Sequence, residues 1–102
     1  MLSLTMEREE SQSLIRLEGE FTLTSAAELK RLLLEGLASG SDLLVDLERT
    51  DEIDITVLQL LWAAGREAGR TGARMVSLVS VPVAAAARDA GFERFPGTAV
   101  QE

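Results

Sequence analysis

At the centre of the chain, residues 43–56 read LLVDLERTDEIDIT. The first five of these residues, Leu43 to Leu47, are nearly continuous apolar sequence, which is typical of a strand covered on both faces. The acidic residues from Glu48 to Asp54 predict a loop, and a helical period then runs from about Thr56 to Arg70. A buried strand followed by an amphipathic helix is the repeating unit of an α/β fold.

Two further strands are predicted before this unit. Apolar and polar residues alternate over residues 2–6 and again over residues 15–21, with the polar residues 9–12 between them. Such alternation indicates strands with one apolar face. Because only a short polar segment joins the two strands, we expect an antiparallel hairpin.

The remaining elements follow from caps and breaks in the pattern. Ser25-Ala26-Ala27-Glu28 has the spacing of a capping box, which makes Ser25 the predicted N-cap of a helix that ends at residues 39–41. Further along lie a buried strand, an alanine-rich helix and a turn into a short tail, at residues 75–79, 82–91 and 95–97. The helix is predicted to end at Gly91, with Phe92 folding back onto it.

The element order is therefore β-β-α-β-α-β-α. It predicts an α/β fold with a mixed sheet of four to five strands, an N-terminal hairpin and three main helices. We expect a single domain over residues 1–102. The pattern leaves the order of the strands in the sheet open.

Composition excludes several kinds of chemistry. The 102 residues include no cysteine, no histidine and no tyrosine. Disulfides, thiolate metal sites and Ser-His triads are therefore excluded. We expect a protein that is not an enzyme, that has no metal site and that needs no cofactor.

The formal net charge is −7, which makes nucleic acid an unfavourable partner. No apolar run is long enough to span a membrane, so we expect no direct membrane insertion. Residues 1–10 lack the basic start and apolar stretch of a signal peptide. We therefore expect a cytoplasmic protein.

The acidic segment from Asp46 to Asp54 has three interpretations. Carboxylates such as Asp51 and Asp54 could bind Mg²⁺, which prefers oxygen ligands. They could also serve as acid and base in a small carboxylate enzyme. The third interpretation, which the residue pattern favours, is a solvated loop in which Asp54 caps the following helix.

Thr56 lies at the start of that helix and on its predicted outer arc. A kinase could reach a threonine there, and a phosphate would add nearly two negative charges beside Asp51, Glu52 and Asp54. The alternative is that Thr56 is only a second capping hydroxyl, and spacing alone favours this alternative.

The outer face of the same helix is a candidate binding surface. Gln59 and Arg66 lie on it, and Trp62, the only tryptophan of the chain, flanks the buried arc. A tryptophan in such a position is either the edge of the core or an anchor at an interface. Leu34, which lies off the buried face of the first helix, has the same two interpretations.

The order of the predicted elements and five short sequence motifs together resemble the STAS family, the sulfate transporter and anti-sigma factor antagonist domains. The motifs lie at residues 17–21 (LEGEF), 43–47 (LLVDL), 53–56 (IDIT), 72–79 (GARMVSLV) and 89–92 (DAGF). The resemblance runs from about Leu2 to Phe92, and its specificity comes from the order of the motifs along the chain. It implies a non-enzymatic protein-interaction domain.

In anti-sigma factor antagonists the second helix opens with Asp-Ser-Ser-Gly, whose second serine is phosphorylated by an anti-sigma factor that is a kinase. By resemblance, Asp54 matches the aspartate and Thr56 the phosphorylated serine, whereas Ile55 and Val57 depart from the pattern. The resemblance thus implies a phosphorylation site at Thr56. The candidate partner-binding residues are Asp54 at the helix start and, from their place on its outer face, Gln59, Trp62 and Arg66.

The partner implied by the resemblance is an anti-sigma factor or serine kinase, or another signalling or transporter subunit. The alternatives are a STAS adaptor in a chemotaxis or signalling cluster and the STAS subunit of a phospholipid-transport ABC complex. A small Mg-dependent carboxylate enzyme remains as a different class. A homodimer is also compatible with the family.

Overall fold

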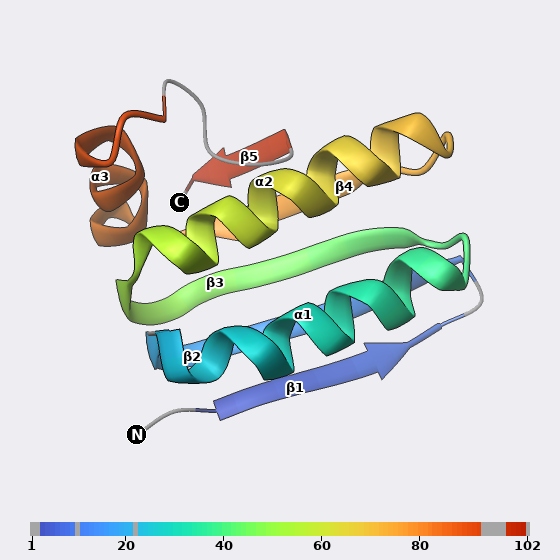
Figure 1. Cartoon of the computed structure of the whole chain (residues 1–102), viewed down its shortest axis with the longest axis horizontal. Coiled ribbons are helices and arrows are strands. Elements are labelled where there is room, and N and C mark those ends of the chain that lie inside the picture. The colour runs from blue at the N-terminus through green and yellow to red at the C-terminus, as the bar shows by residue number, and fades with distance from the viewer. Residues whose placement is uncertain (1–2, 10, 22, 93–97, 102) are drawn as a thin grey trace.

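A mixed five-stranded sheet in the order β1-β2-β3-β4-β5 is the framework of the molecule (Figure 1). The computed structural model describes residues 3–9, 11–21, 23–92 and 98–101. β1 pairs antiparallel with β2, and the later strands pair in parallel, which confirms the predicted hairpin and mixed sheet. The strands are β1 (Ser3–Arg8), β2 (Gln12–Phe21), β3 (Asp42–Ile53), β4 (Met75–Val79) and β5 (Thr98–Gln101).

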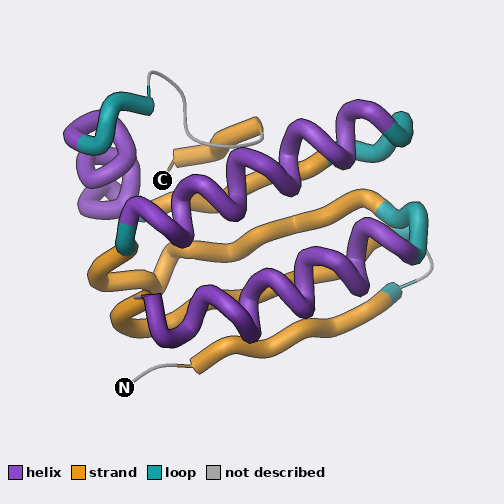
Figure 2. The backbone as a smooth tube through the Cα atoms, viewed as in Figure 1, coloured by secondary structure: helices purple, strands orange, loops and turns teal. Residues whose placement is uncertain are grey.

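Helices α1 (Leu23–Ala38) and α2 (Ile55–Arg70) lie side by side over one face of the sheet (Figure 2). Each connects two neighbouring parallel strands, so the two helices run in the same direction. α3 (Val81–Asp89) follows β4 and contacts β3. None of the helices in the described part of the chain is long and apolar enough to cross a membrane.

The core lies between the helix layer and the sheet. Ile15 and Leu17 of β2 and Val45 and Leu47 of β3 are fully buried there. The helices contribute the apolar faces that the 3.6-residue period predicts. Their buried residues include Ala26, Leu29 and Leu33 of α1 and Val57, Leu58, Leu61, Ala64 and Ala68 of α2.

The prediction that β3 is covered on both faces is wrong. Leu44 and Asp46, which alternate with the buried residues of β3, are only half-buried, as are Leu14 of β2 and Val76 of β4 beside Leu44. Because α1 and α2 lie on the same face of the sheet, the helix layer buries only every second residue of the strand.

The predicted acidic loop at residues 48–54 is also wrong, because β3 continues as a strand to Ile53. Residues 49–53 pair with the second half of β2, across two irregularities in the register. Buried Thr50 donates its hydroxyl hydrogen bond to the carbonyl of Leu17 at 2.9 Å, which joins the two strands inside the core. Pairing with a distant strand therefore overrides the loop-like composition.

Ser25 is not the N-cap of α1. The helix begins at Leu23, so Ser25 lies inside the first turn, where it is buried. The carboxylate of Glu28 accepts hydrogen bonds from Arg31 instead of closing a capping box. The capping-box spacing predicted the helix but placed its start too late.

The C-terminal part supplies the fifth strand of the predicted four to five, at a place where the sequence pattern showed no strand. β5 pairs parallel with β4 at the edge of the sheet, where only a tail was expected. The predicted turn at residues 95–97 lies outside the described residues. The end of α3 is as predicted: Gly91 has a φ of 97°, the amide of Phe92 donates to the carbonyl of Ala87 at 3.0 Å, and Phe92 packs against the core.

Two helical glycines provide a matched test of the packing between α1 and β3. A methyl group on Gly36 would collide with the side chain of Leu43, which is buried, whereas one on Gly69 of α2 would meet no atom within 4 Å. We expect Gly69→Ala to raise the free energy of unfolding by about 0.5–1 kcal/mol through helix propensity. Gly36→Ala should lower it by about 1–2 kcal/mol, because overpacking outweighs the same gain. Urea unfolding measures both, and equal stabilisation by the two substitutions would contradict this packing.

Candidate functional site

The start of α2 is organised by Asp54. Its backbone is extended, with φ −82° and ψ 151°, and its carboxylate Oδ1 accepts a hydrogen bond from the amide of Thr56 at 2.7 Å. Its carbonyl accepts the first helical bond, from the amide of Leu58 at 3.1 Å. Asp54 is thus the N-cap of α2, the interpretation that the residue pattern favoured.

Thr56 lies in the first turn of α2, directly after this cap. It is half-buried, so it is less accessible than its place on the predicted outer arc suggests. Asp51 and Glu52, at the end of β3, are exposed. Thr56 therefore lies at a helix N-terminus, just after three carboxylates in the sequence. This position is compatible with both interpretations of Thr56, a phosphorylation site and a capping hydroxyl.

The three outer-face candidates of α2 share one side of the helix. Gln59 and Arg66 are exposed, and Trp62 is 46% exposed, so Trp62 is not enclosed by the core. The Arg66 guanidinium carbon lies 4.7 Å from the centre of the Trp62 ring, a cation–π arrangement. The two side chains therefore lie against each other at the surface of the helix.

Ile55 extends this face and was not predicted as a site residue. It is the first residue of α2 and is 50% exposed. Residues 55, 59, 62 and 66 follow the i, i+4, i+7, i+11 spacing of one helix face. We call Ile55, Gln59, Trp62 and Arg66 the α2 stripe. The spacing was visible in the sequence, but the exposure of an isoleucine beside a buried strand was not.

The α2 stripe differs in charge from the rest of the chain. The helix contains Arg66, Arg70 and Glu67, a net charge of +1, whereas the whole chain carries −7. Glu67 is paired with Arg70 at 3.0 Å, and Arg66 stacks on Trp62. The outer face of α2 therefore exposes an aromatic ring and a guanidinium, two groups that are enriched at binding hot spots.

The carboxylates of the acidic segment have structural roles where the structure shows their bonds. Asp54 caps α2, and Asp46 accepts a hydrogen bond from the Nε of Arg16 at 3.1 Å and another from the amide of Glu48 at 3.0 Å. Among the described residues, no three His, Cys, Asp or Glu side chains gather as ligands for a metal ion. Asp51 and Asp54 therefore do not belong to an assembled ligand set in that part of the chain.

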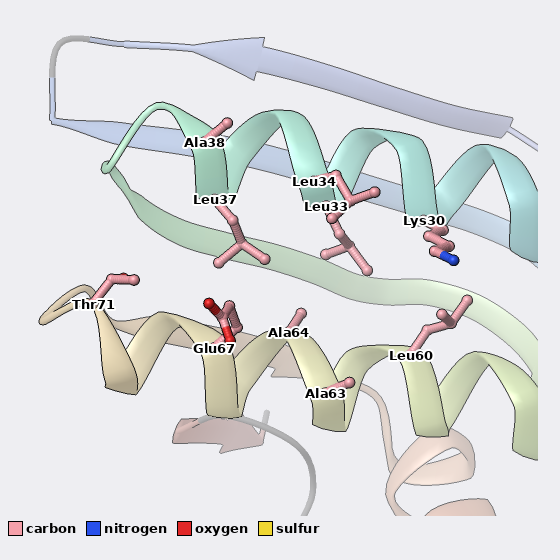
Figure 3. A pocket seen from close by; sticks show the side chains of 10 residues that line it. All are labelled: Lys30, Leu33, Leu34, Leu37, Ala38, Leu60, Ala63, Ala64, Glu67 and Thr71. Carbon is pink, nitrogen blue, oxygen red and sulfur yellow. The ribbon is translucent and has the colours of Figure 1, made fainter.

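A groove between α1 and α2 is a second surface feature, and sequence reasoning missed it (Figure 3). Its volume is about 540 Å³. Leu34 is one of its lining residues and is 56% exposed, which favours the interface interpretation of that residue over the core-edge one. The lining residues are Lys30, Leu33, Leu34, Leu37, Ala38, Leu60, Ala63, Ala64, Glu67 and Thr71. We call this feature the α1–α2 groove.

On the outer surface of α1, Arg31 pairs with Glu28 and with Glu35. The hydrogen bond from Arg31 lowers the pKa of Glu28, and the reciprocal bond and charge of Glu28, with a smaller contribution from Glu35, raise the pKa of Arg31. In the described part of the chain, Lys30, which lines the groove, forms no ion pair.

Comparisons with solved structures support this architecture. The anti-sigma factor antagonist SpoIIAA in its unphosphorylated form is similar with a TM-score of 0.78 and 17% identity, over 98% of this chain and 89% of that one. The phosphorylated form of SpoIIAA from Bacillus gives a TM-score of 0.76 and 16% identity, over 98% and 91%. A variant of RsbS from Moorella thermoacetica gives 0.75 and 19%, over 97% and 86%. At these identities the likeness shows a common fold.

A comparison with curated protein sequences gives no match. A family model described as "Mlab, STAS domain" matches residues 4–96, which include both strands of the hairpin, the cap at Asp54 and the whole of the α2 stripe. The match therefore covers nearly the entire chain and ends before β5. The chain belongs to the STAS domain family.

Proposed function

We propose that this STAS domain is a non-enzymatic regulatory module that binds a protein partner through the α2 stripe. The observation that carries the proposal is the Trp62–Arg66 pair, a half-exposed ring with a guanidinium 4.7 Å from its centre. A preformed aromatic–arginine pair on a rigid helix loses little side-chain entropy on binding. Asp54, which caps the same helix, holds the stripe in place.

The partner we propose is an anti-sigma factor or serine kinase, or a comparable signalling or transporter subunit. Solved structures with this fold are described as an anti-sigma factor antagonist and as its phosphorylated form. The basic end of α2 favours a partner that presents carboxylates to Arg66 and Arg70.

We further propose that phosphorylation of Thr56 weakens this binding. A phosphate there adds nearly two negative charges within the first helical turn. The Asp54 carboxylate lies directly beside it, since it accepts the hydrogen bond of the Thr56 amide at 2.7 Å. The phosphate would repel this carboxylate and the carboxylates of the partner, and its bulk would stand at the start of the stripe.

A second candidate is a constitutive adaptor in a signalling cluster or an ABC transport complex. Ile55 favours it, because a half-exposed isoleucine at the first position of α2 suits a permanent apolar contact. In the Asp-Ser-Ser-Gly motif of the antagonists, the first serine stands at the position of Ile55. In the adaptor, partner binding needs the stripe but does not respond to Thr56.

The first prediction concerns the stripe. The tagged chain, expressed in its own host, captures a partner that mass spectrometry identifies. We expect Arg66→Glu and Trp62→Ala each to reduce recovery of that partner by about 10-fold or more, the loss typical of a hot spot. Arg88→Glu is the matched control, because Arg88 is an exposed arginine on α3. Full recovery with both stripe variants, or equal loss with Arg88→Glu, would contradict binding through the stripe.

The second prediction concerns the switch. We expect mass spectrometry of the chain from its own host to locate phosphate on Thr56. Thr56→Glu should reduce partner recovery by about 10-fold, and Thr56→Val should retain it, because a glutamate fits the helix N-terminus but brings the repelling charge. The matched control is Thr5→Glu, because Thr5 is an exposed threonine on β1, outside both the stripe and the groove. Phosphate at other residues only, or normal recovery with Thr56→Glu, would favour the constitutive adaptor.

A further inference from the structure

The α1–α2 groove has the shape of a seat for a third helix. Leu33 and Ala64 form its floor and are buried, while Leu34, 56% exposed, and Ala63 stand on its two walls. Along α1 the lining residues lie at positions 30, 33, 34, 37 and 38, and along α2 at 60, 63, 64, 67 and 71. Both sets have the i, i+3, i+4, i+7 spacing of helix ridges, between which another helix packs.

The length of the groove sets the length of its occupant. From Lys30 to Ala38 and from Leu60 to Thr71 the lining residues span about 12–16 Å of helix axis. This length corresponds to about ten residues of a docked helix. Its apolar side would cover the leucines of the two walls.

Charge orients the occupant. Lys30 lies at the same end of the groove as Leu60, and Glu67 lies toward the opposite end, near Thr71 (Figure 3). Because α1 and α2 run in the same direction, their positive N-terminal ends both lie toward Lys30. A helix that runs antiparallel to them places its own negative C-terminal end there. In the described part of the chain Glu67 forms an exposed pair with Arg70, which a new cation can replace at little cost.

We propose that the α1–α2 groove receives an amphipathic helix of a protein partner, antiparallel to α1 and α2, with carboxylates in its C-terminal half and a lysine or arginine in its N-terminal half. Carboxylates of the docked helix pair with Lys30, and its cation pairs with Glu67. A second copy of the chain is disfavoured as the occupant, because two chains of −7 repel each other.

The groove is a surface separate from the α2 stripe, so the inference goes beyond the proposed function. Trp62 is not among the lining residues, and it lies about 160° around the helix from Leu60. Two partner elements, or two partners, can therefore occupy the two sides of α2 at once.

The test uses two labelled helical peptides of fourteen residues and the full chain. Both peptides carry leucines at i, i+3, i+4 and i+7. The first has lysines in its N-terminal half and glutamates in its C-terminal half, and the second has these charges exchanged. Fluorescence anisotropy measures their affinities, and backbone-amide NMR shifts locate the bound peptide.

We expect the first peptide to bind at least about 10-fold more tightly than the second, with shifts concentrated at Leu34 and Ala63. Leu34→Asp, at an exposed position that leaves the fold intact, should weaken the first peptide by at least about 10-fold. Exchanging the groove charges with Lys30→Glu and Glu67→Lys should reverse the preference. Trp62→Ala should leave peptide binding unchanged. The proposal for the groove and the proposal for the stripe are therefore tested independently of each other.

Equal affinity of the two peptides, or no binding of either, would overturn the proposal. Binding that Leu34→Asp does not weaken would also overturn it. Concentration-dependent self-association that Leu34→Asp abolishes, measured by analytical ultracentrifugation, would assign the groove to a second copy instead.

Discussion

The parallel pairing of β2 with β3 is the constraint on which the rest of the structure depends. It continues past the buried half of β3 to Ile53, with the Thr50 hydroxyl bonded to the Leu17 carbonyl inside the core. Because β3 ends at Ile53, Asp54 is placed to cap α2 and the helix begins at Ile55. A helix that started one residue later would turn every side chain by about 100° around its axis. The pairing therefore determines which residues of α2 face the core and which form the stripe.

Both candidate surfaces follow from where the two parallel helices lie. Crossovers between neighbouring parallel strands place α1 and α2 on one face of the sheet, side by side and in the same direction. Their facing sides enclose the α1–α2 groove, and the outer side of α2 carries the stripe. The helix layer is also where the strongly acidic chain is least acidic, since α2 has a net charge of +1. A small STAS domain thus presents two distinct surfaces around a single helix.

Local patterns predicted the features that depend on neighbouring residues. The 3.6-residue period identified the buried arc of α2, and the position of Asp54 before it identified the cap, because both are set within one or two turns. Two features that depend on distant pairing were not predicted, the second half of β3 and the position of β5. The charged second half of β3 reads as a loop until β2 pairs with it, and the four residues of β5 are too few to show alternation. The prediction of Ser25 as an N-cap is wrong because the capping-box spacing does not distinguish a cap from a residue inside the first turn. The groove needs two helices side by side, which no local pattern shows.

We propose that Trp62 and Arg66 form the surface that a partner covers. Trp62 is the only tryptophan in the chain and is 46% exposed, so its fluorescence reports on this surface alone. The most direct measurement is a titration of the chain with its captured and purified partner. The tryptophans of the partner are replaced by substitution, so that the emission and acrylamide quenching report on Trp62. Burial of the ring predicts a shift of the emission to shorter wavelength and a large loss of quenching at saturation. Saturable binding with unchanged emission and unchanged quenching would contradict the account.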